Sequence, residues 1–185
     1  ISKGFHFPNL NCIVVVDIDV TLNGYDLRAA EKNLQLYHQL SGRAGRTGKP
    51  ATVYFQTYNT KSDIISQITN VNPDIFLEKE LVLRKRNNLP PFERFISIIL
   101  SGKNQKTIES FAYKLKEKLD NNLNAKILGP VIAPIFKINK NFRYRILVRS
   151  KKTQKIQKNL SSILKNFKNQ KEIKLAVDVD PISFN

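Results

Sequence analysis

The sequence has little of the chemistry that disulfide-linked or zinc-stabilised proteins need. Its 185 residues include one cysteine, Cys12, two histidines, and neither methionine nor tryptophan. One thiol excludes an internal disulfide, and one thiol with two imidazoles cannot complete a four-ligand structural zinc site. We therefore predict a reducing compartment and no metal site. Because Cys12 lies in the apolar run 12–16, we expect its thiol to be buried.

Long hydrophobic runs and a starting methionine are also missing. No apolar stretch approaches the ~18 to 20 residues of a membrane helix, and no short apolar run follows a basic start as in a signal peptide. We therefore expect a soluble, cytosolic protein. Because the sequence opens at Ile1 and holds no methionine, we interpret it as a fragment or as a chain trimmed at its front.

Acidic residues are scarce relative to basic ones. Lysine and arginine total 31 against 15 aspartates and glutamates, which gives a net charge of +16. Such an excess favours polyanionic partners, either nucleic acid or an anionic membrane. The 22 lysines, 20 isoleucines and 19 asparagines also fit an AT-rich coding bias with no functional pressure. The position of the charge must separate these two explanations.

The basic charge is concentrated in the second half of the chain. Residues 1–89 hold 11 basic and 8 acidic residues, a net charge of +3, whereas residues 90–185 hold 20 and 7, a net charge of +13. Between Lys126 and Lys174 there are 14 basic residues and one acid, Glu172. A coding bias spread over the whole chain does not predict such a local concentration of basic residues. We therefore interpret the segment as a local basic surface.

The first half of the chain reads as half of an α/β domain. Residues 12–16 form a β-branched run of the kind that is buried on both faces of a parallel sheet. Asp17 and Asp19 follow it, and such carboxylates either bind a ligand or act as caps and turn formers. Periodicity predicts a helix over 27–40, a strand over 52–57, and one or two helices over 64–86 around the Asn72-Pro73 break.

The second half predicts a ferredoxin-like fold, with the element order β-α-β-β-α-β. This arrangement is a four-stranded antiparallel sheet with two helices on one face. The expected strands are 95–100, 131–138, 143–149 and 173–179, and the expected helices are 107–119 and 153–167. A turn at 139–141 would join the second strand to the third.

Alternation along residues 143–149 separates an apolar face from a basic face. The first set is Tyr144, Ile146 and Val148, and the second is Arg143, Arg145, Leu147 and Arg149. If the helices cover the first set, the arginines project from the open face beside the 137–140 hairpin, where they can grip phosphate oxygens. The alternative is a solvated edge strand whose charges block aggregation.

Aromatic residues that could stack on bases are few in this region. Phe136 and Phe142 are the candidates, and core packing is the more common role for a residue such as Phe136. Contact with the nucleic-acid backbone or with a duplex is therefore favoured over base readout.

The end of the predicted 27–40 helix carries the pattern Q-x-x-G-R-x-G-R, with Gln39, Gly42, Arg43, Gly45 and Arg46. Two arginines three residues apart, in a helix interrupted by small residues, can both reach a triphosphate. Their planar donors stabilise the charge that develops in phosphoryl transfer. The glycines allow close approach of the backbone, and Gln39 can hydrogen-bond a nucleotide. The alternative is a solvated helix end.

This pattern resembles motif VI of superfamily 2 helicases, and residues 3–8 with 14–19 resemble the tail of motif V. The sequence is similar throughout to the PriA family of bacterial replication-restart helicases, also called primosomal protein N-prime. The similarity covers essentially all 185 residues. Its signatures are residues 26–46, 55–58, 89–92, 128–131 and 178–181.

The resemblance implies the C-terminal portion of an ATP-dependent 3′-to-5′ DNA helicase that recognises stalled forks and D-loops and restarts replication by primosome assembly. It implies the end of a RecA-like lobe at 1–60, a helical connector at 61–89 and a DNA-binding domain at 90–185. Arg43 and Arg46 would be catalytic, at the γ-phosphate. The cofactor-binding residues would be Gln39, Gly42, Lys3 and Gly4. The nucleic-acid-binding residues would be His6, Lys137, Lys140, Arg143, Arg145 and Arg149.

Other parts of such a helicase do not occur in the sequence. There is no G-x-x-x-x-G-K-[ST] loop and no D-E-x-H run, so ATP and Mg²⁺ would be bound with a first lobe. The zinc ions of the family would bind outside this sequence as well. We predict that the chain alone binds DNA and does not hydrolyse ATP.

The resemblance also implies partners and a location. The partners would be branched DNA, primosome proteins and the single-stranded-DNA-binding protein. The candidate contacts for the acidic tail of that protein are Lys152, Lys155 and Gln157, and the alternative for these residues, which the charge pattern favours, is a solvated helix face. The protein would be a monomer at the bacterial nucleoid. Two alternatives stay open: a stand-alone nucleic-acid-binding module without catalysis, and the second lobe of a translocase acting on RNA.

Overall fold

The computed structural model describes residues 10–19, 27–42, 50–61, 65, 73–167 and 172–182. The chain divides into two compact units, Ile1–Glu80 (unit 1) and Leu81–Asn185 (unit 2). The division falls inside helix α4 (Pro73–Arg86), upstream of the Pro90-Pro91 pair. None of the described helices is long and apolar enough to cross a membrane.

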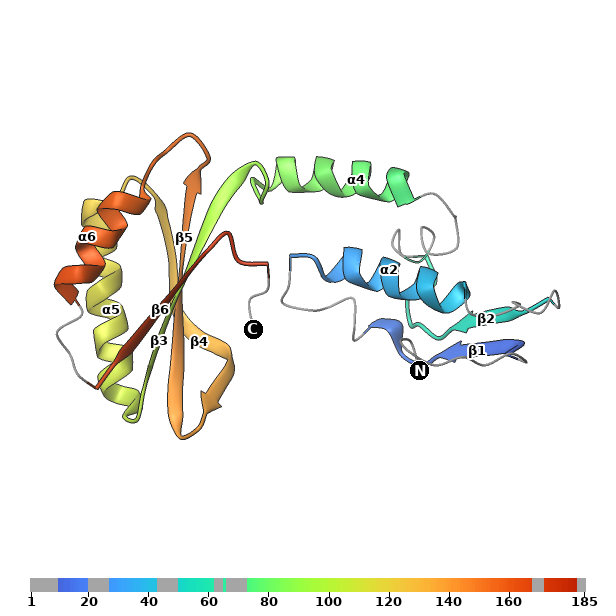
Figure 1. Ribbon diagram of the computed structural model, residues 1–185, viewed down its shortest axis with the longest axis horizontal. Coiled ribbons are helices and arrows are strands. Elements are labelled where there is room, and N and C mark those ends of the chain that lie inside the picture. Colours follow the sequence, from blue (N-terminus) through green and yellow to red (C-terminus); the bar gives the residue numbers. More distant parts are fainter. Residues whose placement is uncertain are drawn as a thin grey trace. The chain divides into compact units, whose positions relative to one another are not determined.

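Unit 1 contains a small parallel sheet and a helix packed on it. Strand β1 (Cys12–Val15) pairs with β2 (Thr52–Phe55), and helix α2 (Ala29–Ser41) lies between them in sequence (Figure 1). Tyr37 of α2 packs edge-on against Phe55 with 5.2 Å between ring centroids. The strand, helix and strand predicted from periodicity are therefore confirmed.

The expectation that β1 is buried on both faces is wrong for the described residues. Val15 and Phe55 pack against the core that contains Leu34 and Tyr37, whereas Val14 is 60 % exposed and Cys12 is exposed. Side chains alternate between the two faces of a strand, and α2 packs on only one of them. The predicted buried thiol is therefore also wrong.

Asp19 joins the ends of the two strands of unit 1. Its carboxylate accepts hydrogen bonds from Thr57 Oγ1 at 2.9 Å and from the Tyr58 backbone N–H at 2.8 Å. These contacts occupy both carboxylate oxygens. Asp19 therefore has a structural role, but these bonds join it to residues 38 and 39 positions away, so they form neither a local turn nor a helix cap.

Helix α4 begins at Pro73, as the predicted break indicated. Proline suits the first turn of a helix because the backbone N–H that it lacks would have no partner there. The last turn carries Arg84, Lys85 and Arg86, whose positive charges interact favourably with the negative end of the helix dipole.

Unit 2 has the predicted order β-α-β-β-α-β. Its elements are β3 (Glu93–Gly102), α5 (Gln105–Asn122), β4 (Lys126–Ile138), β5 (Asn141–Lys151), α6 (Gln157–Phe167) and β6 (Lys174–Val179). The strand order in the sheet is β4-β5-β3-β6, and every neighbouring pair is antiparallel. This is the split β-α-β topology, so the fold expected for the second half is confirmed.

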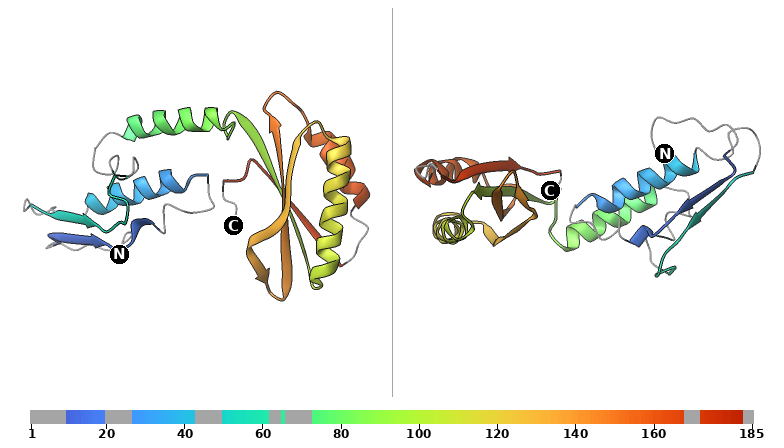
Figure 2. Two further views of the ribbon diagram at one scale, coloured as in Figure 1. Left: turned by 180° about the vertical axis from the view of Figure 1, so that it is seen from behind. Right: turned by 90° about the horizontal axis from the view of Figure 1, so that it is seen from below.

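Both helices of unit 2 lie on the same face of the sheet (Figures 1 and 2). Asn104 caps the start of helix α5, because its side chain accepts a hydrogen bond from the Thr107 backbone N–H at 3.2 Å. Its buried residues recur at helical spacing. They are Ile108, Phe111, Ala112, Leu115 and Leu119, and they meet Ile96, Ile98, Leu100, Tyr144, Ile146 and Val148 of the sheet. The predicted apolar face of β5 therefore packs under the helices.

Candidate nucleic-acid interface

A tight hairpin brings the basic residues of β4 and β5 together. Asn139 and Lys140 form its two-residue turn, and both have positive φ values, 48° and 65°. Two positive φ values at the turn match the right-handed twist of the paired strands. Ile138 pairs with Asn141 directly below the turn. Lys140 is therefore held, exposed, at the tip.

The arginines of β5 lie on the face of the sheet that the helices leave open. Arg143 and Arg145 are half-buried and alternate with the buried Tyr144 and Ile146. Arg143 donates from Nη1 to the backbone carbonyl of Ile135 at 3.3 Å, and this bond holds a segment of β4 in which the register shifts. The predicted basic face is confirmed, and its function stays a prediction.

Burial lowers the pKa of the Arg145 guanidinium below its ordinary value. A guanidinium titrates so far above neutral pH that the side chain keeps its charge. A partly desolvated charge attracts a phosphate more strongly than a fully solvated one, because the medium around it screens less. Arg145 therefore suits a phosphate contact at neutral pH.

Arg149 lies on the same face and has several partners within the protein. Its guanidinium pairs with Glu93, donates to the Asn87 carbonyl at 3.1 Å, and lies over the Phe95 ring at 6.0 Å from the centroid. The side chains of Arg149 and Glu93 are only 20 % and 19 % exposed. These contacts tie the segment after α4 to the sheet. The nucleic-acid contact of Arg149 stays a prediction.

Replacing Arg149 by methionine should destabilise unit 2 by about 1 to 3 kcal/mol, because Glu93 and the Asn87 carbonyl would lose their donor. Urea unfolding of the chain measures this. Lys151→Met, at an exposed position on the same strand, should leave the stability within about 0.5 kcal/mol of the parent. Unchanged stability of Arg149→Met with a clear loss of DNA affinity would overturn the structural role.

The aromatic residues beside the hairpin are engaged within the protein. Lys137 Nζ lies 4.7 Å from the centroid of the Phe142 ring, and Phe136 packs on Phe142 at 5.3 Å and on Tyr144 at 6.3 Å. The ammonium group of Lys137, on the hairpin, therefore makes a cation–π contact with the Phe142 ring. Both rings pack on neighbouring side chains, and the preference for backbone contact over base stacking stays a prediction.

The residues proposed for nucleotide binding are described only in part. Gln39 is exposed on α2, and Gly42 follows the helix, with its N–H donating to the His38 carbonyl at 2.9 Å. The others, Lys3, Gly4, Arg43 and Arg46, lie outside the described residues, as does His6, which was predicted to contact nucleic acid. Among the described residues, no group of three or more His, Cys, Asp or Glu could hold a metal ion.

The sequence reasoning missed the partner of Arg149. Glu93 and Arg149 are 56 residues apart, and their pairing depends on the register between β3 and β5. The available signal was that Glu93 lies two residues before the predicted strand 95–100 and is one of only seven acidic residues in the half after Leu89. It did not identify the partner.

Comparison with known proteins gives the lineage of the chain. The family model described as the primosomal protein N C-terminal domain matches residues 85–182, which covers all the strands and both α helices that follow α4. The chain belongs to the PriA family. The match begins at the end of α4, close to the start of unit 2.

Relatives of the PriA family match the whole chain. The chain is similar to the replication restart protein PriA of Rickettsia felis, with 40 % identity over 184 residues, 100 % of this chain and 28 % of the relative. It is 34 % identical over 189 residues to the protein of that name from Bacillus subtilis, covering 98 % of this chain and 23 % of the relative. The chain thus spans about a quarter of the length of these relatives and corresponds to their C-terminal part.

Proposed function

We propose that the chain forms the C-terminal part of a replication-restart DNA helicase, and that unit 2 binds DNA through the backbone phosphates. Its PriA-family sequence and the names of its relatives support the role in restart. The observation that carries the DNA contact is the row of Arg143 and Arg145 on the open sheet face beside Lys140. Stalled forks and D-loops would be the DNA substrates.

Unit 1 would supply the end of a RecA-like lobe. Parallel pairing of β1 and β2 around α2 supports this, because a RecA-like lobe is built on a parallel sheet. Arg43 and Arg46 would contact the γ-phosphate of ATP, with Gln39, Gly42, Lys3, Gly4 and His6 in the surrounding motifs. Gln39 is exposed, so a nucleotide could reach it. Mg²⁺ and the remaining phosphate contacts would come from another lobe.

The partners and the location follow from the same proposal. The whole protein would act with primosome proteins and the single-stranded-DNA-binding protein in the bacterial cytoplasm, at the nucleoid. Zinc would bind elsewhere in that protein. The separate core of unit 2 also supports a second candidate, a nucleic-acid-binding module that works without catalysis.

The test of DNA binding is the salt dependence of affinity. The chain should bind forked, duplex and single-stranded DNA with an affinity that falls linearly, on logarithmic axes, as salt is raised. Binding that is absent at 50 mM salt on all three would overturn the proposal for unit 2.

The chain alone should show no DNA-stimulated ATPase activity. Arginines at a γ-phosphate stabilise charge only when a phosphate-binding loop and Mg²⁺ hold the nucleotide, and the sequence has no such loop. Phosphate release by purified chain, with and without forked DNA, measures this. Arg43→Ala serves as the control, because any activity from a contaminant would survive it. Activity that this substitution abolishes would contradict the prediction.

A further inference from the structure

A second basic surface lies on helix α5, apart from the arginines of the sheet. Lys106, Ser110 and Lys114 are four residues apart, so they share one face of the helix, and all three are exposed. Lys103 lies just before the helix and is exposed as well. Between Lys103 and Lys114 the sequence contains one acid, Glu109.

Two hollows run along this face and meet at Thr107. One of about 470 Å³ lies at the turn between β3 and α5, and its polar lining includes Lys103, Asn104, Asn141, Glu172 and Lys174. The other, of about 370 Å³, continues along the helix past Lys106 and Lys114. Thr107 lines both. The two hollows therefore form a groove lined by ammonium, hydroxyl and amide groups, the side chains that commonly contact phosphate and sugar, with the Glu172 carboxylate at one end.

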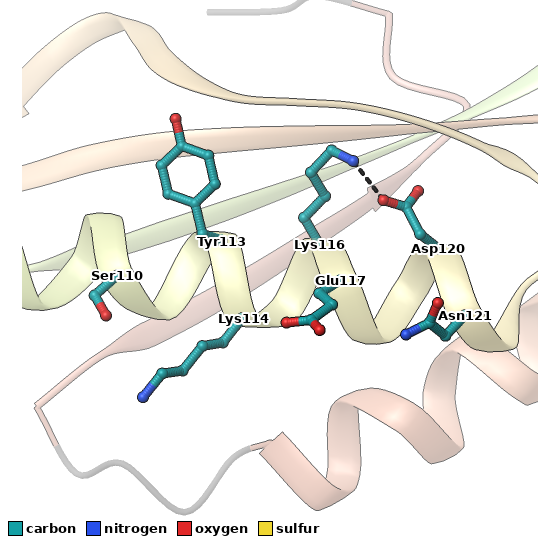
Figure 3. A pocket seen from close by; sticks show the side chains of 7 residues that line it. All are labelled: Ser110, Tyr113, Lys114, Lys116, Glu117, Asp120 and Asn121. Atoms are coloured by element: carbon teal, nitrogen blue, oxygen red, sulfur yellow. Dashed lines mark hydrogen bonds and ion pairs between the residues drawn. The ribbon is translucent and has the colours of Figure 1, made fainter.

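The groove follows one side of α5. Figure 3 shows Ser110, Lys114 and Glu117 projecting to one side of the helix, whereas Tyr113, Lys116 and Asp120 project to the other. Lys116 is paired with Asp120 there. Within the part of the chain that the structure describes, no ion pair joins an acid to the lysines of the groove, Lys103, Lys106, Lys114 and Lys174.

The length of the groove suits a nucleic-acid backbone. The eight-residue step from Lys106 to Lys114 corresponds to a rise of about 12 Å along the helix. One strand of duplex DNA presents a phosphate about every 3.4 Å of axis, so this length faces several phosphates. Small anions would need only one or two of these lysines.

The geometry points to a second binding site for a nucleic-acid backbone on α5, formed by Lys103, Lys106, Thr107, Ser110, Lys114 and Lys174. Helix α5 covers one face of the sheet (Figure 2). Arg143 and Arg145 alternate with Tyr144 and Ile146, which are buried under the helices, so they lie on the other face. One domain can then hold two backbone segments on opposite sides, as a branched molecule offers. The inference rests on the proposed function, because it takes DNA as the partner of unit 2.

The test compares two pairs of substitutions that remove the same charge from the 185-residue chain. K106Q/K114Q alters the groove. K116Q/K158Q is the control and alters two other lysines: Lys116 of α5, which pairs with Asp120, and the exposed Lys158 of α6. If each groove lysine meets a phosphate, K106Q/K114Q should lower the salt slope on forked DNA by nearly two units. The parent would then lose roughly tenfold more affinity than this variant between 50 and 200 mM salt. K116Q/K158Q should match the parent.

A short duplex long enough for one site separates this inference from the proposed function. Its affinity should be insensitive to K106Q/K114Q and should fall in the hairpin variant K140Q/R143Q. If K106Q/K114Q matches K116Q/K158Q on forked DNA while K140Q/R143Q weakens binding, the groove is not a site and the proposed function stands. If neither K106Q/K114Q nor K140Q/R143Q changes the salt slope, the proposed function of unit 2 is wrong too. Thermal unfolding should show that all variants stay folded.

Discussion

Replacing Lys140, Arg143 and Arg145 together by glutamine should flatten the plot of log affinity against log salt by two to three units. Each phosphate that a cation neutralises releases about 0.9 counterion from duplex DNA. Over the range from 50 to 200 mM salt, the parent chain should therefore lose about 40-fold more affinity than the triple variant. Fluorescence anisotropy with labelled duplex and forked DNA at several salt concentrations measures the slopes.

The controls address folding and net charge. Arg143 holds the Ile135 carbonyl and Arg145 is half-buried, so the triple variant could lose local structure. Lys140→Gln alone changes an exposed turn residue and should lower the slope by about one unit. A charge-matched variant, K85Q/K116Q/K158Q, should keep the parent slope. An unchanged slope in both hairpin variants would place the DNA contact elsewhere.

Leu115→Ala should destabilise unit 2 by about 2 to 5 kcal/mol, the usual cost of emptying a packed core position. Leu115 is fully buried in the core that joins α5 to β3 and β5. Amide hydrogens of these elements should exchange roughly 30-fold to several thousand-fold faster, since each 1.4 kcal/mol is a factor of ten. Hydrogen exchange followed by peptide mass spectrometry locates the effect.

The same measurement tests whether the two units unfold separately. Because each unit has its own core, amides of α2 should keep their exchange rates in Leu115→Ala. Tyr113→Ala, on the exposed side of the same helix, should leave both units unchanged. Faster exchange in α2 would show that the stability of unit 1 depends on that of unit 2.

Local periodicity made the second half of the chain predictable. The apolar spacing of α5 and the alternation of β5 each specify which side chains face the core, because a helix repeats every 3.6 residues and a strand every 2. Tyr144, Ile146 and Val148 were assigned to the core on that basis, and they are buried. The element order then left few ways to pair four strands, and the observed order is the common one.

Side chains that meet through register were not predictable in this way. Arg143, Arg145 and Arg149 look equivalent in the alternating pattern, yet Arg149 meets Glu93 across the β3–β5 pair and the other two do not. For β1, the β-branched run fitted a doubly buried strand equally well, and only the packing of α2 on one face showed which side chains are covered.

The features of the candidate site can be separated in the same way, into those that local sequence predicts and those that depend on tertiary contacts. The sequence determined that a basic strand and hairpin exist and that a Q-x-x-G-R-x-G-R segment follows a helix, because charge and motif are properties of neighbouring residues. Only the tertiary structure decided that Arg143 and Arg145 lie on an open face, that Arg149 is tied to the segment after α4, and that Lys103 and Lys174 line one groove. These depend on contacts between residues far apart in the chain, which strand register and helix packing set and local patterns do not encode.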